Sequence, residues 1–345
     1  MLNEKTAAPD GRPFQLTWLQ NAAGMRVCLM DWGATWLSCQ LPIQDGVREV
    51  LLGCASPDQY PRQSAYLGAS IGRYANRIAN ATIRRGDEIF HLAANQDQHQ
   101  LHGGPQGFHT RRWRTLSQDA SHVTYQLYSP DGDQGYPGQL NAQVCYRLSE
   151  NNALEIVYQA TAEKPCPVCL TNHAYFNLDG SPGDVRQHQL QLFADYYLPV
   201  NPAGIPGDHL AQVQGGGMDF RQPKTLAKDF LRDQDQLAVS GYDHAYLLHG
   251  TCGASESPAA NLWSSDRRVL MSVFTSAPAL QLYSGNFLAG TPSREGGSYE
   301  NYAGIALESE FLPDSPNHPE WPQPDCWLRP GQVYRSDTTY QFFSQ

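Results

Sequence analysis

Residues 154–160 have the sequence Leu154-Glu155-Ile156-Val157-Tyr158-Gln159-Ala160. Leucine, isoleucine, tyrosine and alanine take every second position, and this period of two predicts a half-buried β-strand. Segments of similar character occupy residues 14–19, 25–31, 122–128, 140–148, 188–193, 269–275 and 280–283, with a further one around 340–342. The sequence therefore predicts a chain built mainly of strands.

Turn residues separate these segments along the whole chain. The sequence contains 24 prolines and 30 glycines, which is typical of an all-β protein with many hairpins. Only residues 225–237 suggest a helix, and we expect the loop at 250–258 to be the most mobile segment. With no linker or repeat, we expect an all-β fold, one large antiparallel β-sandwich forming a single domain over residues 1–345.

Composition and charge exclude several classes of partner. Hydrophobic residues make up 41% and charged residues 17%, with a net charge of -10. Basic residues form only short pairs such as Arg111-Arg112, which argues against nucleic acid. Residues 1–13 lack the apolar core of a secretory signal, and no stretch is long and apolar enough to span a membrane. We therefore expect a cytoplasmic protein with no membrane partner.

The eight cysteines lie mostly in apolar runs and are interpreted as small core residues. Cys166 and Cys169 are close enough in sequence for a zinc site or a redox dithiol. No second pair follows them, and no thioredoxin-like pattern surrounds them. We therefore expect structural, reduced thiols and no metal site.

Two short loops contain groups that could bind a ligand. Residues 72–80 include Arg73 and Arg77, which fit either an ordinary surface turn or guanidinium groups presented to a sugar. Residues 101–104 place His102 before two glycines, which allow the backbone to approach a ligand closely. Each loop is a weak indication on its own.

Residues 171–178 would form a polar and aromatic stripe if they were one strand. Alternation would then place on one face Thr171, His173, Tyr175 and Asn177. Such a stripe suits a carbohydrate cleft, where an aromatic ring packs on the sugar and amides bind its hydroxyls. The simpler alternative is a solvent-facing surface.

Residues 304–311 would place two carboxylates on one face of a strand. Ile305 and Leu307 would point to one side, and Glu308 and Glu310 to the other, about 7 Å apart. Two such carboxylates suggest a base, although solvated glutamates are common. Alternation alone does not distinguish Glu308 from Glu310.

Taken together, these segments resemble the aldose 1-epimerase (galactose mutarotase) family over nearly the whole chain. The resemblance rests on several ordered motifs, from residues 31–35 to 328–331. They include Gly72-Arg73-Tyr74-Ala75-Asn76-Arg77-Ile78, Leu101-His102-Gly103-Gly104, Thr171-Asn172-His173-Ala174-Tyr175-Phe176-Asn177-Leu178, Tyr242-Asp243-His244, Gln281-Leu282-Tyr283-Ser284-Gly285-Asn286-Phe287-Leu288, and Leu307-Glu308 followed by Pro313-Asp314-Ser315-Pro316-Asn317.

The resemblance implies a galactose mutarotase-like supersandwich that interconverts the α and β anomers of aldohexoses such as galactose and glucose, without metal or cofactor. By position, His173 resembles the proton donor and Glu308 the proton acceptor. The residues that resemble sugar-binding groups are Asn76, Arg77, His102, Asp243 and Gln281, and the aromatic stripe adds Tyr175. Glu310 departs from the glutamine that many members carry there.

This chemistry needs one acid and one base. We expect Glu308 to take the C1 hydroxyl proton while His173, kept protonated by the field of Asp243 or Glu308, protonates the ring oxygen. His102 and Arg77 would hydrogen-bond the oxygen on which negative charge develops. The expected partner is a small aldohexose, and the expected assembly is a monomer or weak homodimer.

Three other functions remain open at this point. An epimerase of phosphorylated hexoses would need more basic groups than Arg73 and Arg77. A glycoside hydrolase could use Asp243 and Glu308 as its carboxylates, but His173 would then have no role. A sugar-binding module without activity would not need both His173 and Glu308.

Overall fold

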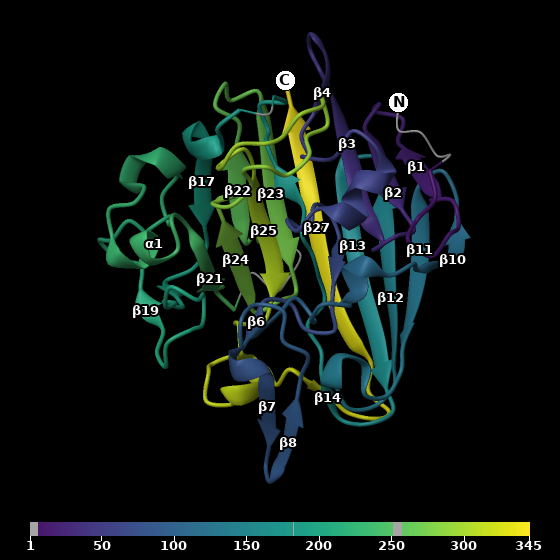
Figure 1. The fold of residues 1–345 in the computed structure, drawn as a ribbon. Coiled ribbons are helices and arrows are strands. Elements are labelled where there is room, and N and C mark those ends of the chain that lie inside the picture. The colour runs from purple at the N-terminus through teal and green to yellow at the C-terminus, as the bar shows by residue number, and fades with distance from the viewer. Residues whose placement is uncertain (1–5, 182, 251–256) are drawn as a thin grey trace.

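A computed structural model describes residues 6–181, 183–250 and 257–345. Its largest sheet has nine antiparallel strands in the order β10-β11-β12-β13-β27-β23-β22-β17-β20 and runs across the molecule (Figure 1). The strands are β10 (Arg114–Gln118), β11 (His122–Ser129), β12 (Leu140–Leu148), β13 (Ala153–Ala162), β27 (Tyr334–Ser344), β23 (Val269–Thr275), β22 (Ala260–Trp263), β17 (Gln189–Leu192) and β20 (Lys224–Thr225).

A second sheet of six antiparallel strands has the order β16-β25-β24-β21-β18-β19. Its strands are β16 (Tyr175–Phe176), β25 (Ile305–Glu310), β24 (Ala279–Tyr283), β21 (Asp243–Leu247), β18 (Tyr196–Tyr197) and β19 (Ala211–Gln212). A third, four-stranded sheet contains β1 (Leu16–Gln20), β2 (Arg26–Met30), β3 (Thr35–Ile43) and β4 (Gly46–Glu49). These layers of antiparallel strands confirm the expected all-β sandwich.

Smaller elements complete the fold, and the β7–β8 hairpin projects from its lower end (Figure 1). Two-stranded sheets pair β14 (Cys166–Pro167) with β26 (Trp327–Leu328), β15 (Thr171–Asn172) with β5 (Ser70–Ile71), β6 (Arg77–Ile78) with β9 (Gln100–Leu101), and β7 (Thr82–Arg85) with β8 (Glu88–His91). The short helices are η1 (Pro57–Arg62), η2 (Ala79–Ala81), η3 (Phe108–Thr110), η4 (Asp133–Gly135), η5 (Val185–Gln187), η6 (Leu226–Asp229), η7 (Ser315–Asn317) and α1 (Gln234–Ala238).

Each strand segment expected from the sequence lies on a strand of the structure, with ends that differ by a few residues. The helix expected at residues 225–237 is wrong. Leu231 has a φ of 56°, in the left-handed region, and this separates η6 from α1. Residues 251–256 of the expected mobile loop lie outside the described residues, and the single domain stays a prediction.

Residues 171–178 do not form the single strand on which the polar and aromatic stripe depended. Thr171 pairs with Ile71 of β5, whereas Tyr175 pairs with Ala306 of β25. The chain changes sheet at His173, whose backbone N–H donates to the carbonyl of Ala69 at 2.9 Å. The change of sheet breaks the alternation that the stripe assumed.

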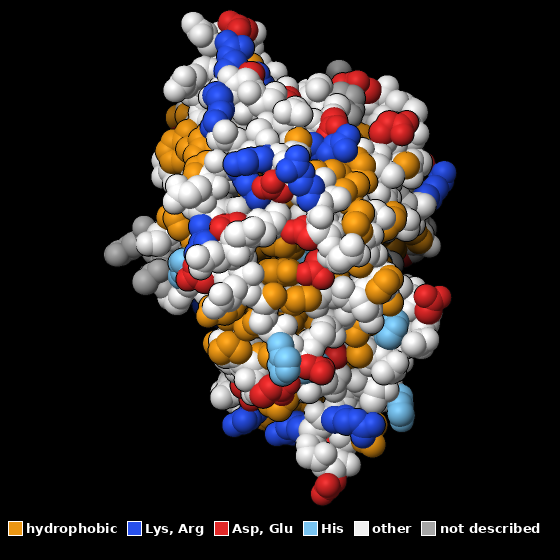
Figure 2. Space-filling model, turned by 90° about the vertical axis from the view of Figure 1, so that its left-hand side faces the viewer, with side chains coloured by type: hydrophobic (Ala, Val, Ile, Leu, Met, Phe, Trp, Pro, Cys, Tyr) orange, Lys and Arg blue, Asp and Glu red, His pale blue; other side chains and the backbone are white. Residues whose placement is uncertain are grey.

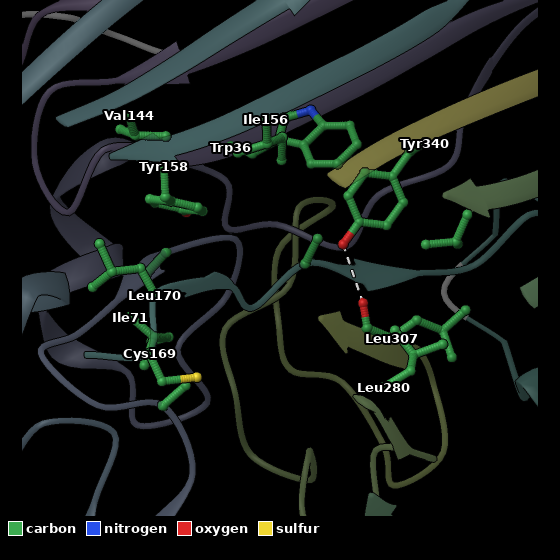
Figure 3. Packing of buried hydrophobic residues seen from close by; sticks show 14 of the residues in the cluster. Trp36, Ile71, Val144, Ile156, Tyr158, Cys169, Leu170, Leu280, Leu307 and Tyr340 are labelled. Carbon is green, nitrogen blue, oxygen red and sulfur yellow. Dashed lines mark hydrogen bonds between the residues drawn. The ribbon is translucent and has the colours of Figure 1, made fainter. Parts of the chain in front are cut away.

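The main core lies between the nine-stranded and six-stranded sheets (Figure 3). Tyr340 of β27 packs against Trp36 at 5.6 Å between ring centroids, and both residues are buried. The Tyr340 hydroxyl crosses to β25 and donates a hydrogen bond to the carbonyl of Leu307 at 3.1 Å. Burial of each large apolar side chain here stabilises the fold by about 1.5–3 kcal/mol. The core thus fixes β25 against the larger sheet.

On the face that carries α1 and β19, Lys and Arg side chains are interspersed with Asp and Glu (Figure 2). This face therefore offers no continuous basic surface of the kind that binds a phosphate polymer. Among the described residues, no helix combines the length and the apolar character needed to cross a membrane.

The bond between Tyr340 and Leu307 gives a test of the core. Tyr340→Phe removes the only donor atom of that side chain, and we expect a loss of about 1–3 kcal/mol in the free energy of unfolding. Urea denaturation at pH 7 measures it. Tyr128→Phe is the matched control, because its hydroxyl donates to Gln139 at 2.9 Å from a ring that is 51% exposed. Equal losses in the two variants would contradict this account.

Candidate active site

Asn76 and His102 form one wall of the site and fix each other. Their φ angles are 62° and 52°, so both have left-handed backbone. The backbone N–H of Asn76 donates to Nδ1 of His102 at 3.1 Å, and the N–H of His102 donates to the carbonyl of Asn76 at 3.0 Å. Pairing of Arg77 with Leu101 in β6 and β9 brings the two loops together. His102 is therefore held with its Nδ1 already accepting a hydrogen bond.

Gly103 makes this arrangement possible. Its φ is 83°, and a Cβ at this position would collide with the carbonyl oxygen of Gly72. Glycine adopts this conformation without a steric cost and leaves room for the neighbouring backbone. Gly103 is thus required because the backbone of this loop packs directly against the backbone at Gly72.

His173 and Glu308 meet at the base of the site. His173 follows β15, Glu308 lies on β25, and their Nε2 and Oε1 atoms are 3.5 Å apart. Both residues are buried, with 4% and 2% exposure. The ring of His173 also lies 4.9 Å from that of Tyr175 and 5.1 Å from that of His102. The predicted acid and base are therefore neighbours in a nearly dry environment.

Arg77, Asp243 and Gln281 form the opposite side. Gln281 of β24 lies directly across from Glu308 and donates from Nε2 to Oδ1 of Asp243 at 2.6 Å. Nη2 of Arg77 lies 3.7 Å from Oδ2 of Asp243, and its Nε donates to Gln96 at 2.9 Å. The paired strands β21 and β24 thus hold Asp243 and Gln281, and the separate strand β6 brings Arg77 to them.

One cleft of about 240 Å³ contains all eight predicted site residues. They are Asn76, Arg77, His102, His173, Tyr175, Asp243, Gln281 and Glu308. The structure adds lining residues that the sequence analysis missed, namely Ser64, Ala65, Tyr66, Gln96, Leu101, Tyr283 and Phe287. Tyr283 could have been found, because it lies two residues after Gln281 on the same strand face. Nothing in the local sequence of Tyr66 indicates its place against His173.

Arg73 does not belong to the cleft, contrary to its expected position near the site. Its side chain is buried and donates to the hydroxyl of Ser129 at 2.8 Å and to the carbonyls of Gly138 and Pro130 at 2.7 and 2.6 Å. These carbonyls need a buried donor, and the planar guanidinium supplies several at once. Arg73 therefore supports the fold.

Burial controls the charge of the carboxylates. Desolvation raises the pKa of Glu308 well above its ordinary value, and the negative charges of Glu310 and Asp243 add to the rise. The positive charge of Arg77 acts in the opposite direction. Desolvation likewise raises the pKa of Glu310 to about 8, while a hydrogen bond from Asn76 opposes the rise.

Burial also decides the charge of the histidines. It lowers the pKa of His173 to about 3, with a further decrease from the charge of His109. The same effect lowers the pKa of His102 well below its ordinary value. Burial therefore favours a neutral His173 in the cleft by itself, contrary to the expectation that the field of Asp243 or Glu308 keeps it protonated.

His102, His173 and Glu308 resemble a metal-binding set by residue type, and one ligand atom from each lies within 4.8 Å of the others. The hydrogen bonding does not fit a resident metal. Nδ1 of His102 accepts from a backbone N–H, so the hydrogen of the neutral ring is on Nε2. That nitrogen is consequently a hydrogen-bond donor and has no free lone pair for an ion.

Known proteins share this sequence and fold. A profile of the family described as aldose 1-epimerase matches residues 15–341. The chain belongs to the aldose 1-epimerase family. An aldose 1-epimerase from Escherichia coli (strain K12) is 58% identical over the full length of both chains. A galactose mutarotase from Homo sapiens is 37% identical, with 92% of this chain and 91% of the relative aligned.

A solved structure agrees with the assignment. The GalM/aldose epimerase homologue from C. elegans superposes with a TM-score of 0.88 at 29% identity, covering 96% of this chain and 99% of that one. As a member of the aldose 1-epimerase family, the protein is an isomerase. The mutarotase-like fold expected from the sequence is confirmed.

The charge state of His173 can be measured directly. We expect its imidazole to stay neutral from pH 5 to pH 8, because burial lowers its pKa to about 3. Imidazole ¹⁵N chemical shifts report this protonation. His318 is the internal control, because hydrogen bonds with Asp314 and Glu320 raise its pKa. Titration of His173 near pH 6.5 would contradict the dominance of burial.

Proposed function

We propose that the protein interconverts the α and β anomers of aldohexoses such as galactose and glucose by acid/base opening and closure of the sugar ring. The observation that carries the proposal is the 3.5 Å separation between Nε2 of His173 and Oε1 of Glu308 in a buried cleft. An acid and a base so close together can serve two oxygens bonded to the same carbon. C1 of a cyclic aldose carries such a pair, namely its hydroxyl oxygen and the ring oxygen.

Opening moves two protons and breaks one bond. Glu308 accepts the proton of the C1 hydroxyl, the bond between C1 and the ring oxygen breaks, and His173 gives a proton to that oxygen. The product is an open-chain aldehyde, which rotates about the C1–C2 bond. Closure reverses both transfers on the other face of the carbonyl. No atom is gained or lost, and the pair of side chains contains one proton throughout.

These roles require an ionised Glu308 and a protonated His173, whereas burial by itself favours the neutral form of each. Neutral Glu308 with neutral His173 and ionised Glu308 with protonated His173 contain the same single proton. Sugar binding must therefore move this proton from the carboxyl group to the imidazole. The charge of Arg77 favours the carboxylate. Hydrogen bonds from sugar hydroxyls would stabilise the same ionised form.

The remaining residues would hold the sugar. Asp243 and Oε1 of Gln281, which has no partner within the described ranges, offer acceptors for hydroxyl groups. His102 offers its Nε2 hydrogen, and Arg77 its guanidinium, to an oxygen that gains negative charge. The rings of Tyr175 and Phe287 provide apolar surface for the carbon face of the sugar. Asn76 lines the cleft and stays a predicted sugar-binding residue, and its backbone N–H also fixes His102 by donating to Nδ1.

The cleft offers little support for a phosphorylated substrate. Arg77 is the only Lys or Arg among the described residues that line it, and Asp243 lies beside it. A phosphate dianion normally recruits several cationic groups. We therefore propose a neutral aldohexose as the substrate.

We also propose that the protein is cytoplasmic and acts as a monomer or weak homodimer. In the part of the chain that the structure describes, the free thiols include those of Cys39, Cys54, Cys166, Cys169 and Cys326, all of which are buried. Free buried thiols are typical of a reducing compartment. Sedimentation velocity would measure the assembly.

Replacement of the acid and the base tests the mechanism. We expect Glu308→Gln and His173→Asn each to reduce kcat by roughly 10²–10⁴-fold, since each removes a positioned proton-transfer group. Polarimetry of freshly dissolved α-galactose measures the rate. Glu300→Gln, at an exposed position, is the control and should retain the full rate. A loss of only a few-fold in either cleft variant would contradict the assigned roles.

A comparison of sugars tests the substrate class. We expect glucose and galactose to be converted and their 6-phosphates to be converted at least about tenfold less efficiently in kcat/KM, because a phosphate would leave its charge poorly paired. Equal efficiency for the phosphates would favour a phosphohexose epimerase. Sugar binding without faster mutarotation would instead identify a binding module.

A further inference from the structure

Glu310 is a buried carboxylate that the proposed reaction does not use. It lies on β25 two residues after Glu308, on the same face of the strand, and only 1% of its surface is exposed. Its Oε1 accepts a hydrogen bond from Nδ2 of Asn76 at 2.9 Å, and its Oε2 has no partner among the described residues. A buried carboxylate with one unsatisfied oxygen is costly to keep, so its presence here needs a reason.

Asn76 holds this carboxylate in a fixed place. Its side-chain Nδ2 donates to Glu310, and its Oδ1 accepts from the backbone N–H of Arg77 at 2.9 Å. Its own backbone N–H donates to Nδ1 of His102. Across β24, Glu310 lies opposite the small side chain of Ala279. Glu310 is consequently locked beside the cleft without being one of the residues that line it.

The charge of Glu310 acts directly on the base. Its negative charge is the largest influence on the pKa of Glu308 after burial, and it raises that pKa. Within the part of the chain that the structure describes, Arg77 is the one positively charged side chain that lowers the pKa of both carboxylates. Among the described residues, the titratable or charged groups around the two carboxylates are Tyr74, Arg77, His102, Cys169, His173, Tyr175, Asp243, Tyr283 and Tyr340.

We propose that Glu310 is a positioning residue whose ionised carboxylate keeps the shared proton on the His173–Glu308 pair at alkaline pH, and so extends the active pH range upward. The inference rests on the proposed function. The pair works only while it contains one proton, and the alkaline limb of the rate profile marks the loss of that proton. A negative charge beside the pair makes the proton harder to remove.

The pH range in which Glu310 helps the pair to retain its proton is the range in which Glu310 is ionised. Burial raises its pKa to about 8, so it is largely neutral below that pH and negative above it. Its charge is therefore present only at alkaline pH, which is the range in which it can act on the pair. Below pH 7 a neutral glutamine at this position should behave like the native side chain.

Glu310→Gln separates charge from hydrogen bonding, because the amide oxygen can still accept from Asn76. We expect the alkaline limb of kcat/KM for α-galactose to move down by about one pH unit, while the acid limb and the maximal rate change little. Ser309→Ala is the matched control. Ser309 is equally buried on the same strand but points to the other face, and it should leave both limbs in place.

An unchanged alkaline limb in Glu310→Gln would overturn the proposal. So would a loss of rate as large as that of Glu308→Gln, since Glu310 would then take part in the proton transfer itself.

A ¹³C titration of the glutamate side chains in the native protein gives an independent reading that does not need the variant to fold. Ionisation of Glu310 near pH 8, before that of Glu308, supports the proposal. Loss of the Glu308 proton while Glu310 is still neutral overturns it, because Glu310 would then carry no charge where the pair loses its proton. A native protein without mutarotase activity at any pH would refute the proposed function, and the titration would still decide whether the two charges interact.

Discussion

The site depends on the burial of both faces of β25. All six residues of this strand are buried. One face carries Leu307 into the core, where the hydroxyl of Tyr340 binds its carbonyl (Figure 3). The other face carries Glu308 and Glu310 toward the cleft. Because the core fixes the strand, the two carboxylates cannot move out to water, and their proton affinities are set by the protein around them.

The facing wall of the cleft depends on a different constraint, namely backbone that only a few residues tolerate. Asn76 and His102 are both left-handed, and Gly103 must lack a Cβ. This backbone geometry lets the N–H of Asn76 donate to Nδ1 of His102, and this fixes the tautomer with its hydrogen on Nε2. Rigid strands thus supply the acid and the base, while tightly turned loops supply a fixed hydrogen-bond donor.

Much of this could be predicted from the sequence. The period of two in β13 and its neighbours predicted the all-β fold, and the ordered motifs predicted the residues that the structure gathers in one cleft. Local patterns failed where tertiary packing decides. The change of sheet at His173 and the turn at Leu231 have no signature in the sequence. The buried role of Arg73 depends on the carbonyls of Pro130 and Gly138, more than 50 residues away in the chain.

The central claim is that one proton, shared by His173 and Glu308, serves the whole reaction. Isothermal titration calorimetry at pH 7 in buffers of different ionisation enthalpy counts the protons exchanged when galactose binds. If binding only moves the shared proton from Glu308 to His173, the heat should be the same in every buffer and the net exchange zero. Uptake or release of about one proton per sugar bound would contradict the claim.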